Sequence, residues 1–257
     1  MNGLGRSAAL FGVTLSALTL VAGHAAAQGV DELGTYGGIE KWQYESPQHA
    51  AVELRFGRYV PGVDDEFSGA TPYADAFGDK NRYLIGLEVD WQLLQIPSFG
   101  TLGPGIGFGY TTASGKARVS STGTESDQET SLSILPMYLV GVLRIDVFAQ
   151  DLGIPLVPYG KLGLGYALWW SSSGDDSARD DAGVIGRDTS YGWQYALGGM
   201  LHLDAFDPRS AADMDMSTGV NNSYLFIEWY VSHLDGFGGD KMEVGTNTWM
   251  LGLALEL

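Results

Sequence analysis

Cysteine is absent from the 257 residues, which excludes disulfide bonds, thiolate metal sites and cysteine nucleophiles. Basic residues are scarce, because 14 Lys and Arg stand against 31 Asp and Glu, for a formal net charge of −17. Phosphate neutralisation needs clustered Lys and Arg, so we expect no nucleic-acid partner. No stretch beyond the first 27 residues is long and apolar enough for a membrane-spanning helix, which takes about 20 residues.

Glycine and large aromatic residues are abundant instead. The chain has 37 Gly, 7 Trp and 13 Tyr, and glycine is at roughly twice its usual share. Such an aromatic content is not typical of a disordered chain. The composition therefore indicates a folded protein.

The first 27 residues are typical of a secretory signal peptide. Arg6 precedes an apolar run over residues 8–21, and Ala25 to Ala27 form a small-residue cleavage site. The alternative is an uncleaved membrane anchor, although the run is short for spanning a bilayer. We therefore predict three parts: a signal peptide (residues 1–27), a periplasmic lead-in (28–49) and the folded domain (50–257).

The mature chain alternates between apolar and small or polar residues. In residues 81–92 one parity is apolar, and the other carries Gly86, Glu88, Asp90 and Gln92. Residues two apart on a strand share a face, so each such segment predicts a strand with one uncharged apolar face. The eight predicted strands span residues 50–60, 81–94, 101–112, 130–147, 157–170, 189–204, 222–234 and 244–257.

Two architectures are compatible with this alternation. A soluble sandwich or lipocalin-like barrel turns its polar faces to water, whereas a membrane barrel turns its apolar faces to lipid. Predicted strands of ten or more residues, and Trp170, Tyr191 and Trp193 flanking one loop, favour the membrane barrel. We predict an all-β, eight-stranded, up-and-down antiparallel transmembrane β-barrel located in the outer membrane.

The predicted connections alternate between long acidic loops and short turns. The long segments 61–80, 113–129, 171–188 and 235–243 carry net charges of −4, −1, −3 and −2, which total −10. Outer-membrane barrels have long external loops, so we expect both termini in the periplasm. The turn over 205–221 is the exception. There Asp207 before Pro208 predicts the start of a short periplasmic helix, and Gly219 predicts its end.

A repeated tetrad fixes which residues face inward. Four strands end in Leu87–Asp90, Leu143–Asp146, Leu201–Asp204 and Leu253–Glu256. This register predicts a salt-bridged inward plug, because buried charges must be paired; its residues are Glu53, Arg55, Glu88, Lys161 and Glu228. It also predicts an inward, water-exposed periplasmic ring of Asp90, Asp146, Asp204 and Glu256. The ring could bind a divalent cation, repel anions, or simply solvate the strand ends.

Several segments resemble a myxobacterial outer-membrane β-barrel family. The resemblance rests on Leu135-Pro136, Arg144-Ile145-Asp146, the run from Ile154 to Tyr166, Trp169-Trp170 and Gly219-Val220-Asn221-Asn222. It covers most of the mature chain and implies a single outer-membrane barrel. The family has no assigned activity, so it implies no catalytic residues.

Catalytic signals are weak. Gly103, Gly105, Gly107 and Gly109 alternate along a predicted strand and are not a nucleotide-binding loop. Ser232 and His233 are adjacent and point to opposite faces. His202 points inward with Asp204 two residues on, but we expect no inward serine at that depth and interpret His202 as a polar residue at the barrel mouth.

We therefore expect a non-enzymatic outer-membrane protein with an envelope-structural or surface-binding role through its acidic external loops. The alternatives are a narrow channel for ions or small solutes and a lipid-modifying enzyme. We expect no cofactor. The expected partners are outer-membrane lipid and lipopolysaccharide, the barrel-assembly machinery, and divalent cations that the acidic loops, such as residues 175–181, could bind through oxygen ligands.

Overall fold

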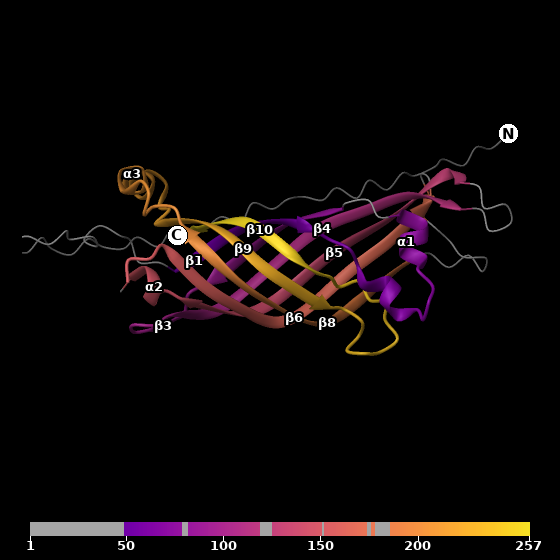
Figure 1. Ribbon diagram of the computed structural model, residues 1–257, viewed down its shortest axis with the longest axis horizontal. Coiled ribbons are helices and arrows are strands. Elements are labelled where there is room, and N and C mark those ends of the chain that lie inside the picture. Colours follow the sequence, from indigo (N-terminus) through magenta and orange to yellow (C-terminus); the bar gives the residue numbers. More distant parts are fainter. Residues whose placement is uncertain (1–48, 79–81, 119–124, 151, 174–175, 178–185) are drawn as a thin grey trace, which may run out of the picture. The chain divides into compact units, whose positions relative to one another are not determined.

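The computed structural model describes residues 49–78, 82–118, 125–150, 152–173, 176–177 and 186–257 (Figure 1). The signal peptide and almost all of the periplasmic lead-in lie outside the described residues. Among the described residues no helix is long and apolar enough to cross a membrane.

The described residues form one closed antiparallel barrel. Its eight strands are β1 (Ala50–Arg58), β2 (Tyr83–Trp91), β4 (Gly100–Arg118), β5 (Glu125–Ile145), β6 (Leu156–Ser173), β8 (Arg187–His202), β9 (Asn222–His233) and β10 (Asn247–Glu256). Each strand pairs with the next in this order, and β10 pairs back with β1. Two minor strands, β3 (Leu94–Ile96) and β7 (Asp176–Ser177), pair with β4 and β6. The strands tilt strongly across the barrel in Figure 1, as closure of a sheet requires.

The alternation predicted from the sequence is confirmed in the direction of the side chains. In β2, residues at odd positions from Tyr83 to Trp91 are mostly exposed, and those at even positions are buried. Both parities of the predicted strand 130–147 are largely apolar, and the tetrad places the parity of Asp146 inward; in agreement with this, Tyr138 and Arg144 are buried while Leu139 is exposed. The glycines of β4 lie on the inner side: a Cβ at Gly107 would lie 2.3 Å from Cζ of Tyr138, so glycine makes room for that ring.

The outer face carries a continuous set of exposed large apolar side chains. Leu162 is 68% exposed, Ile85 and Trp249 are 61% exposed, and Leu164 is 59% exposed. Soluble monomers rarely expose contiguous apolar surface on this scale. The inverted arrangement, apolar outside and charged inside, is the one that a lipid environment favours.

The two ends of the barrel differ (Figure 1). At one end of the barrel lie the start of β1 and the end of β10. The short helix α2 (Val147–Gln150) and the helix α3 (Pro208–Thr218) lie at the same end. Helix α3 was predicted correctly: Asp207 accepts a hydrogen bond from the Ser210 backbone nitrogen, and Gly219 ends the helix with φ +73°. The other end carries η1 (Gly62–Glu66) and α1 (Pro72–Phe77).

The connections are more structured than the sequence predicted. Residues 61–80, predicted as a loop, contain η1 and α1. Residues 113–118 and 125–129, also predicted as a loop, extend the β4–β5 hairpin, whereas the last strand begins at Asn247 and not at residue 244. Residues 95–100 and 148–156, which form two of the short connections, contain part of β3 (Leu94–Ile96) and most of α2. The polar ends of β4 and β5 lack the apolar alternation that marks a membrane strand. They nevertheless continue the antiparallel pairing of β4 with β5.

Candidate functional site

All five residues of the predicted inward plug lie inside the barrel. Glu53, Glu88 and Glu228 are 0% exposed, Arg55 is 3% exposed and Lys161 is 4% exposed. They come from β1, β2, β6 and β9. The strand register places Glu53 directly opposite Glu88 across β1 and β2.

Lys161 bridges two of these carboxylates. Its Nζ atom lies 2.6 Å from Oε2 of Glu53 and 2.6 Å from Oε1 of Glu88. The same ammonium lies 5.1 Å from the centroid of the Tyr159 ring. Charge-assisted hydrogen bonds of this length are strong in a medium without water, so Lys161 ties three strands together.

Arg55 forms a second bridge, toward the centre of the barrel. Its guanidinium contacts the carboxylates of Glu88 and Glu228 and lies over the Tyr138 ring at 5.4 Å. Tyr138 donates a hydrogen bond to Glu88 at 2.7 Å, and Tyr159 donates one to Glu228 at 2.8 Å. Tyrosine hydroxyls therefore donate hydrogen bonds to the buried carboxylates in addition to those from Arg55 and Lys161.

The predicted periplasmic ring is wrong in its arrangement. Asp90 and Glu256 are 2% and 4% exposed, so they are neither solvated nor placed around an open mouth. Arg144 lies between them, 2.9 Å from Oδ2 of Asp90, 2.8 Å from Oε1 of Glu256 and 3.2 Å from Oε1 of Glu53. Arg144 shares the parity of Asp146, so the predicted register places it inward, but strand parity alone does not show which acids it pairs with.

The other two acids of that ring lie beyond their strands. Asp146 follows the end of β5 and is partly buried; burial, together with the nearby Glu256 carboxylate, raises its pKa to about 6, against the opposing effect of Arg144. Asp204 follows β8 and accepts hydrogen bonds from the backbone nitrogen and the hydroxyl of Ser223 at 3.2 and 2.6 Å. Asp90 and Glu256 lie on the inner side of β2 and β10, so the predicted register holds for these two strands, whereas Asp146 and Asp204 lie beyond the ends of theirs.

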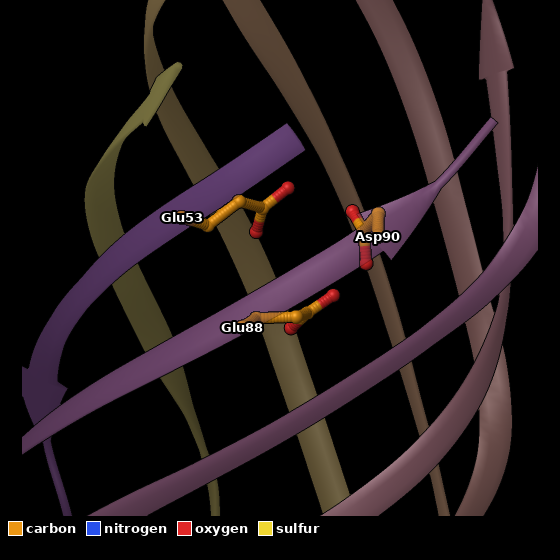
Figure 2. A group of neighbouring side chains, drawn as sticks. All are labelled: Glu53, Glu88 and Asp90. Carbon is orange, nitrogen blue, oxygen red and sulfur yellow. The ribbon is translucent and has the colours of Figure 1, made fainter. Parts of the chain in front are cut away.

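We call the buried charged set the ionic plug. It contains the five predicted residues together with Asp90, Arg144 and Glu256. Figure 2 shows Glu53, Glu88 and Asp90, whose carboxylates converge and each offer one oxygen within 4.8 Å of the others. These three residues have the donor set of an oxygen-ligated metal. However, the ammonium of Lys161 already contacts two of them, so the chain supplies its own cation at this position.

A second cluster, mainly apolar, closes the interior toward the α1 end. Its buried members include Ile134, Leu234 and Met250 from the barrel, and Val63, Tyr73 and Phe77 from η1 and α1. We call residues 61–78 the mouth segment. It is fixed by a backbone hydrogen bond from Gly62 to Gly245 at 2.9 Å, and α1 lies directly against Gly115, where a Cβ would come within 2.3 Å of the Ala76 carbonyl oxygen.

The lumen between these two clusters is narrow. A cavity of about 10 Å³ lies beside Arg55, Tyr138 and Tyr230, which is room for about one water molecule. At eight strands a barrel interior is just wide enough for side chains to fill. The described side chains fill it with charge at one end and with apolar groups at the other.

The catalytic candidates do not form a nucleophile–base pair. The structure brings Ser223 beside His202 and Asp204, a serine that the sequence reading missed because Ser223 belongs to the neighbouring strand β9. Its hydroxyl donates to Asp204, while His202 Nε2 lies 2.8 Å from Asn222 Oδ1. Ser232 is buried and His233 is exposed, in agreement with their predicted opposite faces.

Comparisons with known proteins find similarity only among solved structures, and it concerns the fold. No family model matches the chain, and no curated protein matches it. Among solved structures, the attachment invasion locus protein Ail of Yersinia pestis has 16% identity and a TM-score of 0.43, with 83% of this chain and 100% of that chain covered. Neisserial surface protein A has 13% identity and a TM-score of 0.41, with coverages of 82% and 97%. The outer membrane enzyme PagL has 14% identity and a TM-score of 0.40, with coverages of 80% and 99%.

The class of protein follows from this chain's own geometry. Eight antiparallel strands close on themselves, the outer face is apolar and exposed, and the charges are buried inside. The protein is an outer-membrane β-barrel.

Proposed function

We propose that the protein is a non-enzymatic outer-membrane barrel with an envelope-structural or surface-binding role, and that its acidic loops face the exterior. The observation that carries the proposal is the filled interior. The ionic plug and the apolar cluster beneath the mouth segment occupy successive levels of the lumen. A filled interior favours a structural or surface-binding role over a channel.

The orientation follows the usual asymmetry of these barrels. The α1 end carries the long β4–β5 hairpin and the mouth segment, whereas the α3 end carries two short connections, the longer connection that contains α3, and both ends of the barrel segment. Long connections belong to the external face of outer-membrane barrels. We therefore place the α3 end in the periplasm and the acidic connections outside, where lipopolysaccharide and divalent cations would meet them.

Conductance of the refolded protein in planar lipid bilayers tests the filled lumen. We expect no stepwise conductance above that of the lipid alone. The matched variant Leu234→Gly, which shortens a fully buried side chain of the apolar cluster, should remain closed because the ionic plug is untouched. Discrete, voltage-stable openings of the unmodified protein would favour the narrow channel instead.

The enzymatic alternative is tested on lipid. The arrangement of His202, Asp204 and Ser223 does not favour it, since the Ser223 hydroxyl is directed to the acid and not to the imidazole. Mass spectra of lipid A from cells with and without the protein should be identical. A loss of acyl chains that depends on the protein, and that Ser223→Ala abolishes, would favour a lipid hydrolase.

A further inference from the structure

The ionic plug contains more acids than bases. Its five carboxyl groups belong to Glu53, Glu88, Asp90, Glu228 and Glu256, and its three cations to Arg55, Arg144 and Lys161. All eight residues are at most 4% exposed. If every group were ionised, the plug would carry a net charge of −2 in a nearly dry interior, where uncompensated charge is strongly unfavourable. The interior therefore needs a further positive charge.

Asp90 is the carboxyl group with the fewest partners. Glu53 contacts two cations, Glu88 contacts two cations and a tyrosine hydroxyl, and Glu228 contacts Arg55 and Tyr159. Glu256 accepts from Arg144, Gln92, Asn222 and Tyr224. Asp90 contacts Arg144 through Oδ2, while its Oδ1 atom is buried with no hydrogen-bond partner among the described residues.

The surroundings of Asp90 favour a proton over a metal ion as the additional positive charge. Glu53 and Glu88 converge on it, each with an oxygen within 4.8 Å (Figure 2). On the side of β4, a Cβ at Gly105 would lie 2.2 Å from Oδ1 of Asp90, so this oxygen is closely packed. A metal ion requires several oxygens at about 2.0–2.6 Å around it, and Lys161 already contacts Glu53 and Glu88. A proton requires no additional space.

We propose that Asp90 is a proton-binding site of the barrel interior and holds its proton at neutral pH. The protonated carboxyl group donates a hydrogen bond toward the neighbouring carboxylates. It reduces the net negative charge of the plug from −2 to −1. The groups that face Asp90 are Glu53 from β1, Glu88 from β2, Arg144 from β5 and Lys161 from β6, with Glu256 of β10 joined through Arg144. The remaining negative charge is best placed on Glu256, which accepts from four donors.

Infrared spectroscopy of the full-length protein, refolded in lipid vesicles at pH 7, tests the proposal. At this pH exposed carboxyl groups are ionised, so a carbonyl band of a protonated carboxylic acid reports a buried one. We expect this band in the unmodified protein and its loss in Asp90→Asn. The band should persist in the matched variant Asp213→Asn, which removes an exposed carboxyl group on α3. Absence of the band in the unmodified protein, or its persistence in Asp90→Asn, would overturn the proposal.

Unfolding by urea gives a second, independent readout. Asparagine is a neutral isostere of protonated aspartic acid, so Asp90→Asn should fold at neutral pH. As the pH rises from about 4, where aspartic acid ionises in the unfolded chain, to neutral pH, the unmodified protein should lose stability relative to Asp90→Asn, because only its folded state still holds the proton. Failure of Asp90→Asn to fold, or one stoichiometric metal ion in the purified protein by elemental analysis, would instead show that Asp90 acts as an anion.

Discussion

The ammonium of Lys161 lies 2.6 Å from Oε2 of Glu53, although the two residues are 108 positions apart in the sequence. Lys161 belongs to β6 and Glu53 to β1, which do not pair with each other. The contact therefore crosses the lumen. It shows that the interior of this barrel is held together by long side chains that reach across it as well as by the ladder of the sheet.

The apolar outer face makes a prediction about lipid exposure. Leu164 of β6 is 59% exposed and faces outward between Leu139 and Trp193 on the neighbouring strands. Leu164→Arg should lower the free energy of unfolding in lipid vesicles by about 2–4 kcal/mol if the residue lies near the midplane. The control Thr112→Arg changes an exposed residue on the polar part of β4. Equal stability of both variants would indicate that Leu164 faces water.

The mouth segment makes a prediction about packing. A Cβ at Gly115 would lie 2.3 Å from the Ala76 carbonyl oxygen and 2.9 Å from Phe77 Cα, both backbone atoms that cannot move alone. Gly115→Ala should displace α1 and speed proteolysis within residues 61–78, while the barrel itself stays folded. Gly199→Ala is the matched control, because a Cβ there meets a side-chain atom only at 3.5 Å. Equal cleavage rates in the two variants would contradict direct packing of α1 on β4.

The pKa of Asp146 makes a prediction about pH. Burial and the Glu256 carboxylate raise it to about 6, above the value of about 3.9 expected for an unfolded chain. The folded state therefore binds this proton more tightly, and the resulting contribution to stability is present below pH 4 and lost as the pH rises toward 6. Asp146→Asn should raise the stability at pH 7 relative to the unmodified protein, with less gain at pH 4. The exposed variant Asp213→Asn should show no such difference.

The sequence predicted the fold through one physical signal, the period of two. Lipid on one side and packed side chains on the other impose that period on β2, β6 and β10, so their strands, register and inward charges could be read from residue types. Helix α3 could be read because Asp207 and Gly219 are local signals that depend on no distant contact.

Other features depend on partners that a period cannot identify. Helix α1 is short and is held by packing on Gly115 and by its place in the apolar cluster, so it reads as a loop. The polar ends of β4 and β5 extend beyond the alternating segment and pair with each other, for example Lys116 with Glu129. Strand parity places Arg144 in the interior but does not identify its three acidic partners, which come from β1, β2 and β10.

The free energy of unfolding of Lys161→Met tests the central claim, a dry interior held by paired charges, most directly. The substitution keeps the length of the side chain and leaves Glu53 and Glu88 without their shared ammonium. We expect a loss of about 3–5 kcal/mol in urea unfolding from lipid vesicles, and a loss within about 0.5 kcal/mol for the exposed control Lys116→Met. A loss for Lys161→Met as small as that of the control would contradict the account, because it would mean that water already solvates the plug.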